Sequence, residues 1–280
     1  GVVRRDSQVI GDGYLTAAIL GLVEGITEFL PISSTGHLII AGSLLGFEGE
    51  RAKTFEIFIQ LGAILAILWI YRSRFLELVR TAAQSEQSRR FIWNLAIGFL
   101  PAAVAGLIFH RQIKQYLFGP IPVAWALVVG GLVMLLIERL KPVAKVSDAG
   151  GISPRQALGV GLAQVLSLFP GVSRSGATIM GGYALGLSRT AATEFSFFLS
   201  VPVMIAATGF DLLKSREALS LADFPIFAIG FIVSFVSAVV VVRAFLRYIS
   251  HHSFTVFAWY RIALGGLLLW WYLHPSAPGV

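Results

Sequence analysis

The sequence predicts an all-α polytopic membrane protein with about six transmembrane helices, two re-entrant helix–loop–helix hairpins and an inverted-topology internal repeat. Hydrophobic residues make up 56% of the 280 residues and charged residues only 13%, against about 25% charged in an ordinary soluble domain. So few charges cannot cover a water-exposed surface of this size. The composition therefore excludes an ordinary soluble enzyme, a coiled coil and a disordered chain.

Six apolar segments are long enough to cross a bilayer, which takes about 20 helical residues. Each segment is continuously apolar, whereas the strands of a membrane barrel alternate between apolar and polar residues. We therefore expect six membrane-spanning helices. Their ranges are 55–71, 91–109, 121–137, 195–213, 224–245 and 254–273.

Two further regions are apolar but are interrupted by proline, glycine and hydroxyl residues. The region 14–46 is broken at 31–36, and the region 156–186 is broken at 170–176. Backbone that leaves the helix at membrane depth is tolerated only where protein or a wet cavity surrounds it. Both regions are therefore predicted to be re-entrant hairpins.

The two broken regions also align with each other at an offset of 140 residues, which places Ser33 opposite Ser173. We interpret the match as an internal duplication within a single membrane domain, 1–280, with one repeat at about 14–138 and the other at about 154–273. Each repeat holds one hairpin and three spans. Three is odd, so the second repeat should enter the membrane from the opposite side, as in many secondary transporters.

The loops that this topology places on one side of the membrane carry most of the basic residues. They are Arg72, Arg74, Arg80, Arg89, Arg90, Arg139, Lys141, Lys145, Arg155, Arg243 and Arg247. Because basic loops stay in the cytoplasm, we expect both termini and the mouth of the first hairpin to face outward. No basic stripe with interleaved aromatic residues is present, so we expect no nucleic-acid partner. The lack of cysteine excludes a thiol nucleophile and a disulfide scaffold.

Two carboxylates, Glu24 and Glu28, lie in the first broken region, where ionisable groups are costly and indicate function. Their i, i+4 spacing puts them on one helix face. Two carboxylates so placed repel each other unless one keeps a proton or a cation lies between them. The plainer alternative is a helix end that is merely solvated at the membrane surface.

The break that follows these carboxylates supplies hydroxyl groups and the free amides of a new helix start, which suit an anion. Within it, His37 lies one turn from Ser34 and could act as base, acid or nucleophile. The second break carries Arg174, whose guanidinium can bind phosphate bidentately. Further candidate contacts to a bound anion are Ser33, Thr35, Gln60, Ser173, Ser175 and Thr178.

In an inverted repeat the hairpin tips meet near the midplane, which would bring Arg174 to the carboxylates, Ser34 and His37. The alternative is a salt bridge between Arg174 and a glutamate, without a ligand. Another charge at membrane depth, Arg261, could pair with Asp211 or with helix ends.

Two long segments carry a resemblance to a known family. EGITEFLPISSTGH (24–37) resembles the first signature of the bacterial undecaprenyl-pyrophosphate phosphatases, the bacitracin-resistance family, and FPGVSRSGAT (169–178) resembles the second. The similarity extends from about 14 to 273, nearly the whole chain. No signature position departs from the family pattern.

The resemblance implies an integral enzyme of the bacterial inner membrane that removes one phosphate from undecaprenyl pyrophosphate, the lipid substrate, at the outward face. It also implies a divalent metal, Mg²⁺ or Ca²⁺, which we expect Glu24 and Glu28 to hold because hard cations prefer carboxylate oxygens. The family's functional residues correspond to Glu24, Glu28, Ser34, His37 and Arg174, with Ser33, Ser173 and Thr178 as phosphate contacts.

Several alternatives stay open at this point. Ser34, His37 and a water molecule held by the metal are all compatible with the sequence as nucleophile. A transporter or flippase of polyprenyl phosphate lipids is the second functional hypothesis, because broken helices in inverted repeats are typical of transporters. Duplicated folds of this kind often form dimers, so a homodimer embedded among membrane lipids is one expected assembly.

Overall fold

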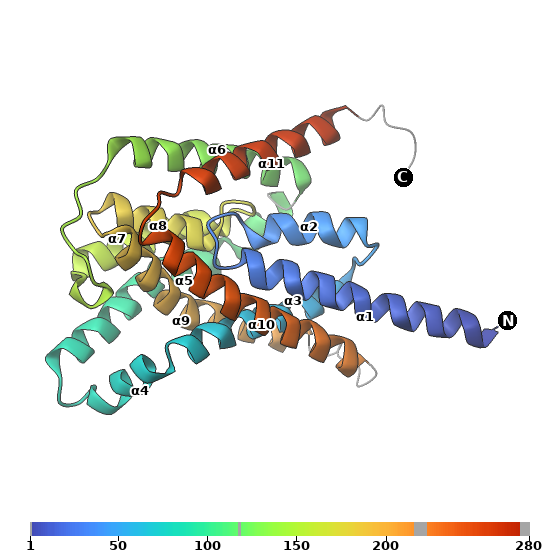
Figure 1. The fold of residues 1–280 in the computed structure, drawn as a ribbon, viewed down its shortest axis with the longest axis horizontal. Helices are drawn as coiled ribbons and strands as arrows, with labels where there is room; N and C mark the ends of the chain where they lie inside the picture. Colours follow the sequence, from blue (N-terminus) through green and yellow to red (C-terminus); the bar gives the residue numbers. More distant parts are fainter. Residues whose placement is uncertain (1, 117–118, 216–222, 275–280) are drawn as a thin grey trace.

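The computed structural model describes residues 2–116, 119–215 and 223–274, and these are helical almost throughout (Figure 1). The helices are α1 (Val2–Thr27), α2 (Ser34–Leu44), α3 (Glu50–Ile70), α4 (Arg72–Thr81), α5 (Glu86–Tyr116), α6 (Pro120–Leu140), α7 (Pro154–Val165), α8 (Arg174–Ala184), α9 (Arg189–Ser215), α10 (Phe224–Ile249) and α11 (Thr255–Leu273), with 3₁₀ turns at Ala149–Gly151 and Leu166–Leu168.

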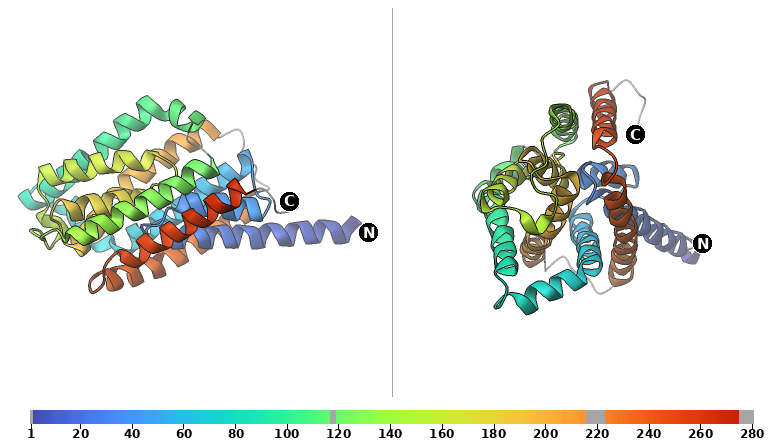
Figure 2. Two further views of the ribbon diagram at one scale, coloured as in Figure 1. Left: turned by 90° about the horizontal axis from the view of Figure 1, so that it is seen from above. Right: turned by 60° about the vertical axis from the view of Figure 1, so that its left-hand side comes forward.

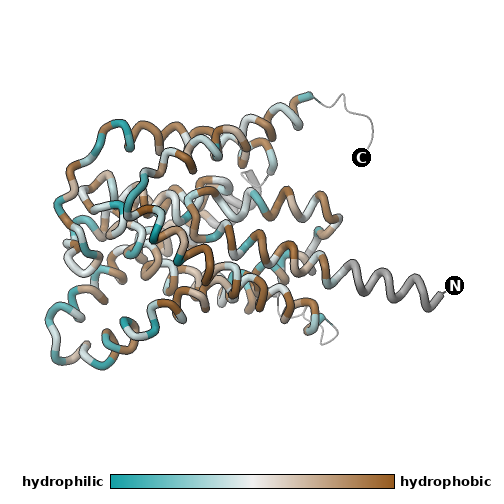
Figure 3. Tube along the Cα trace, viewed as in Figure 1, coloured by the Kyte–Doolittle hydropathy of each residue, from teal (hydrophilic) through white to brown (hydrophobic). Residues whose placement is uncertain are grey.

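Six helices of the described chain are long and apolar enough to cross a membrane, which confirms the predicted spans. They are α3, α5, α6, α9, α10 and α11. Hydrophobic colour follows these helices in Figure 3, and hydrophilic colour gathers where they are joined at the end opposite the termini. The short amphipathic helix α4 was not predicted, because the basic residues at 72, 74 and 80 indicated only a loop.

The helices pack in matched pairs. The packing of α1 against α10 has a counterpart in α7 against α5, and that of α1 against α2 has one in α7 against α8. The equivalent helices α3 and α9 contact each other, as do α6 and α11. The first helix of each half thus packs against a helix of the other half, which agrees with a duplication. The inverted orientation of the repeats stays a prediction.

Glycine allows close helix contacts at equivalent places in the two halves. A Cβ atom on Gly21 of α1 would collide with the backbone oxygen of Gly230 on α10, and one on Gly161 of α7 would meet that of Gly98 on α5 at 2.6 Å. Small residues are the usual means by which membrane helices approach each other closely. These contacts fix the helix that precedes each break.

The start of α1 and the end of α11 lie at one end of the molecule (Figures 1 and 2). The segments that join α4 to α5, α6 to α7 and α10 to α11 lie at the other end. These joining segments and the helix ends beside them carry the basic residues that the sequence analysis assigned to a single side of the membrane. The two helix breaks lie between these ends.

Candidate active site

The two helix breaks end in the same way. Ser33, before α2, and Ser173, before α8, have positive φ angles of 72° and 74°. Each serine caps its helix, with its Oγ accepting a hydrogen bond from the amide of Gly36 at 3.3 Å or Gly176 at 3.0 Å. A side-chain oxygen in this position stabilises a helix start. Two helix starts, in each of which the amides of the first two residues have no carbonyl partner in the helix, are thereby set within the fold.

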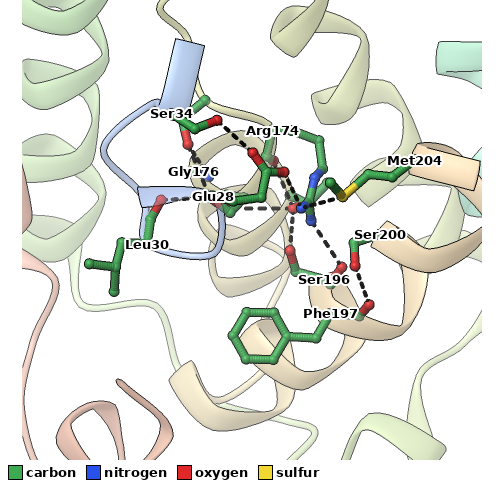
Figure 4. A network of polar contacts seen from close by, with 12 residues as sticks. Glu28, Leu30, Ser34, Arg174, Gly176, Ser196, Phe197, Ser200 and Met204 are labelled. Carbon is green, nitrogen blue, oxygen red and sulfur yellow. Dashed lines mark hydrogen bonds and ion pairs between the residues drawn. The ribbon is translucent and has the colours of Figure 1, made fainter. Parts of the chain in front are cut away.

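A chain of polar contacts joins the two breaks through Glu28, as Figure 4 shows. Arg174 Nη2 donates to Glu28 Oε1 at 2.8 Å, and Ser34 Oγ donates to Glu28 Oε2 at 2.5 Å. The side chains of Arg174 and Glu28 are only 12% and 9% exposed. The expected meeting of the two breaks is therefore present, and it brings a hydroxyl, a carboxylate and a guanidinium together.

The guanidinium of Arg174 is held by neighbours from α9 as well. Its Nη1 donates to the backbone oxygen of Ser196 at 3.4 Å and its Nη2 to Met204 Sδ at 3.3 Å. Its Nε–H has no partner in the part of the chain that the structure describes. Its Cζ lies 5.7 Å from the centre of the Phe29 ring. Part of the hydrogen-bonding capacity of the guanidinium is thus free to bind an anion.

These groups line a cavity of about 250 Å³. Of the residues predicted for the site, it is lined by Glu28, Ser33, Ser34, Thr35, Gln60, Ser173 and Arg174. The remaining walls are mostly small or apolar: Ser167, Phe169, Pro170, Gly171, Val203, Met204 and Ala207. The cavity is therefore a polar pocket within an apolar surround, the usual form of a site for a small charged group.

Two predicted contacts, Ser175 and Thr178, lie behind the pocket, and neither lines it. Both are fully buried. Ser175 Oγ donates to the backbone oxygen of Leu30 at 2.8 Å, which ties α8 to the first break. Thr178 Oγ1 lies 2.6 Å from Ser196 Oγ and donates to the backbone oxygen of Arg174 at 2.9 Å. Their contacts support the backbone around Arg174.

The side chain of His37 faces α11 and does not line the pocket. Its Nδ1 lies 2.7 Å from the backbone oxygen of Ser33, and its Nε2 lies 2.6 Å from the hydroxyl of Tyr260, on whose ring it stacks. A carbonyl only accepts, so Nδ1 carries the proton and Nε2 accepts from Tyr260. The hydroxyl of Ser34 is bonded to Glu28 and not to His37.

The other predicted carboxylate, Glu24, lies one helical turn before Glu28 and is fully buried. Among the described residues, neither of its oxygens has a hydrogen-bond partner, and the same holds for the amide group of Gln164, its equivalent at the 140-residue offset. Buried polar atoms without partners call for an explanation such as an ion, a proton or a water molecule. Gln164 was not predicted as a site residue, although its alignment with Glu24 is a signal in the sequence.

Arg261 is a residue of the site that sequence reasoning did not assign. It is 1% exposed and donates to five backbone carbonyls, and it makes no bond to Asp211. Three of the acceptors lie in the breaks, namely Pro31 in the first and Gly171 and Val172 in the second, at 2.9–3.1 Å. The other two are Leu127 and Ala126 of α6. One side chain of α11 thus holds both breaks.

A divalent metal fits these residues only with help from other ligands. Among the described residues, no group of three or more histidines or carboxylates could hold an ion by itself. Glu24 nevertheless offers two unpartnered oxygens one turn from Glu28. Mg²⁺ commonly takes one or two carboxylates and completes its shell with water and substrate phosphates. The donor set is compatible with such a site.

The six spans and the pocket between two helix breaks define a polytopic membrane protein with a site for an anionic group. The chain belongs to the family described as bacitracin resistance protein BacA, whose model matches residues 17–267. It is 56% identical over 255 residues to an undecaprenyl-diphosphatase of Nitrosospira multiformis, covering 91% of this chain and 93% of the relative.

Two further relatives agree. The chain is 57% identical over 256 residues to undecaprenyl-diphosphatase 2 of Rhodospirillum rubrum, covering 91% of this chain and 93% of the relative. It is 54% identical over 259 residues to an undecaprenyl-diphosphatase of Ectopseudomonas mendocina, with 92% and 94% covered. The family expected from the two signatures is thereby confirmed.

Proposed function

We propose that this protein hydrolyses undecaprenyl pyrophosphate to undecaprenyl phosphate and inorganic phosphate. Relatives over more than nine-tenths of the chain carry the name undecaprenyl-diphosphatase. The single observation that carries the mechanism is the contact chain from Ser34 through Glu28 to Arg174, which lines the polar pocket. Hydrolysis recycles the lipid carrier used for building the cell-wall glycan.

The terminal phosphate of the substrate binds in the pocket. Arg174 pairs with its oxygens. The amides of the first two residues of α2 and of α8 donate to them as well, because these amides have no carbonyl partner within their own helices. The third amide of each helix, that of Gly36 or Gly176, is held by the capping serine. The hydroxyls of Thr35 and Ser173 and the amide of Gln60 line the same pocket and add further contacts. The prenyl chain lies against the apolar outer surface of the helices.

Ser34 is the nucleophile in this proposal, and Glu28 is its base. Ser34 Oγ attacks the terminal phosphorus as its proton passes to Glu28 Oε2, 2.5 Å away. The bond from this phosphorus to the bridging oxygen breaks, and undecaprenyl phosphate leaves. Glu28 passes this proton to the departing undecaprenyl phosphate. The ionised Glu28 then takes a proton from water, whose oxygen attacks the phosphoserine. The bond from phosphorus to Ser34 Oγ breaks, Ser34 Oγ takes the proton from Glu28 Oε2, and inorganic phosphate leaves. Arg174 neutralises the charge on the transferring group, which supplies much of the rate in such reactions.

The carboxylates Glu24 and Glu28 would hold a divalent cation, Mg²⁺ or Ca²⁺, which neutralises phosphate charge when bound. His37 acts indirectly, because its Nδ1–H holds the backbone oxygen of Ser33 beside the pocket. The protein lies in the bacterial inner membrane with the pocket open to the outer side, as the basic residues at the opposite end favour. A homodimer stays a prediction.

The test is phosphate release from undecaprenyl pyrophosphate by the purified protein in detergent, for the wild type and for Ser34→Ala. We expect Ser34→Ala to abolish release while it still binds the lipid. Near-normal turnover by Ser34→Ala would exclude the serine route and leave water, activated by Glu28, as nucleophile. A folded wild type that binds the lipid without hydrolysing it would instead favour transport.

A further inference from the structure

A second cavity, of about 660 Å³, lies where α6 and α8 end and where α9 and α11 begin. It is lined by Leu135, Glu138, Arg139, Lys141, Tyr183, Arg189, Ser253, Thr255 and Trp259. It shares no residue with the pocket between the breaks, which is formed where α2 and α8 begin. The ends of α6 and α8 and the start of α11 lie toward the end of the molecule that carries the basic joining segments (Figure 1), so the cavity that they line lies there too.

One wall of this cavity is fixed by an ion pair between buried Glu138 and half-buried Arg189. Arg189 donates to both oxygens of Glu138, from Nε at 3.0 Å and from Nη2 at 2.5 Å. Glu138 Oε1 also accepts from the backbone amide of Phe254 at 2.7 Å. The guanidinium of Arg189 lies 4.8 Å from the centre of the Tyr183 ring. The single carboxylate of the cavity is therefore committed to Arg189 and to the chain before α11.

Two cations in the cavity are left without an acidic partner. Arg139 and Lys141 are exposed, and their side chains make no hydrogen bond or ion pair with any described residue. With Arg189 they give three positive charges against the one negative charge of Glu138. Ser253 and Thr255 add hydroxyl groups at the start of α11. The cavity thus combines net positive charge with hydrogen-bond donors, which suits a phosphate.

The surface beside the cavity is apolar. Only 28% of the α6 span and 17% of the α11 span are buried within the protein. Large apolar side chains on the outer faces of these two helices are more than half exposed: Leu132, Leu136, Leu140 and Val256. Trp259, at the cavity, is 59% exposed, and tryptophan prefers the interface between lipid and water. A lipid with its headgroup in the cavity would lay its chains along this face.

We propose that this cavity binds the phosphate headgroup of an anionic phospholipid. Basic pockets between membrane helices on the cytoplasmic side are typical sites for such headgroups. The cavity lacks the serine–carboxylate pair of the active-site pocket, because Ser253 donates to Thr255 and not to Glu138, which accepts from Arg189 and from the amide of Phe254. The bound lipid is therefore a ligand that holds α6 and α11 together, and it is not a substrate.

The experiment is a titration of the purified full chain with phosphatidylglycerol, followed by native mass spectrometry, which counts lipid bound to folded molecules. The test variant is Arg139→Gln/Lys141→Gln. Both side chains are exposed, so their replacement should leave the fold intact. The matched control, Arg243→Gln/Arg247→Gln, removes the same charge from exposed positions on α10 outside the cavity. Parallel titrations use phosphatidylcholine and inorganic phosphate.

We expect the test variant to bind phosphatidylglycerol about 30-fold more weakly than the wild type, as for the loss of two basic side chains that face a headgroup. The control should change affinity by less than about threefold, and phosphatidylcholine should bind weakly to all three proteins. Equal affinities in the test and control variants would overturn the proposal. Inorganic phosphate that competes with the lipid at equal concentration would show a free-anion site and would also overturn it.

Discussion

Replacement of Arg261 is expected to damage both helix breaks at once. Its guanidinium supplies the only hydrogen bonds found in the described chain for the backbone oxygens of Pro31, Gly171 and Val172. In Arg261→Met, a shorter apolar side chain replaces the arginine stem and offers no donor. At about 1–3 kcal/mol for each buried carbonyl left without a donor, the three together would lower the free energy of unfolding by about 3–9 kcal/mol.

Arg261→Lys tests whether the positive charge alone is enough to hold the two breaks in place. The ammonium keeps the positive charge but places its three donors on one nitrogen, whereas the guanidinium reaches acceptors on several sides. We therefore expect an intermediate loss of stability. We also expect a fall in kcat larger than the change in KM, because the breaks that carry Ser34 and Arg174 would be misplaced while the lipid still binds.

Thermal unfolding in detergent and phosphate release at a temperature where each variant is folded measure these effects. Arg89→Met is the matched control, because Arg89 bonds a single carbonyl, that of Ala83, on an exposed surface. We expect the control to stay within about 0.5 kcal/mol of the wild type. If Arg261→Met were as stable and as active as the control, the inference that one side chain holds both breaks would be wrong.

Three further predictions concern the pocket and its support. Glu28→Gln should lower kcat by about 10²–10⁴-fold, because the base is lost. His37→Asn keeps a hydrogen-bond donor near Ser33 and should lower kcat less. Equal losses in the two variants would indicate that His37 acts as a base. Gly171→Ala should lower the melting temperature more than Gly46→Ala, because both have positive φ but only Gly171 faces the Val123 carbonyl. EDTA should stop phosphate release by the wild type, and Glu24→Gln should need more Mg²⁺ to restore it, as a titration of activity against metal would show.

The membrane-spanning helices could be predicted because each corresponds to a segment of high hydropathy in the sequence. Every span follows from a long apolar run, and the breaks follow from proline, glycine and serine placed where a helix would otherwise continue. The offset of 140 residues also predicted that Ser33 and Ser173 are equivalent, and the structure gives them the same left-handed conformation and the same capping bond. These features are local, so the sequence is enough to find them.

Which side chains meet in the pocket depends on contacts between distant elements. The repeat predicted that Arg174 meets the first break, and a salt bridge to a glutamate was the stated alternative to an anion clamp. The structure contains such a salt bridge, between Arg174 and Glu28. The proximity of His37 to Ser34 along the chain suggested a pair, yet the imidazole turns toward Tyr260, 223 residues away. A spacing of one helical turn between two residues does not determine which neighbour the imidazole contacts.

The role of Arg261 had no local signal. A charge in an apolar span suggested an acidic partner such as Asp211, but carbonyls exposed by two distant breaks provide the acceptors instead. Room for its guanidinium comes from Gly130, where a Cβ atom would collide with the side chain. Such an arrangement becomes visible only when both breaks and α6 are packed around α11.

The central claim is that groups from both helix breaks form a single phosphatase site. It is tested most directly by phosphate release from undecaprenyl pyrophosphate with the purified wild type, Glu28→Gln and Arg174→Ala, in the presence of Mg²⁺ or Ca²⁺. The account predicts release by the wild type and a near-complete loss in each variant, although the two residues are 146 positions apart. Release that survives in folded Arg174→Ala would contradict it.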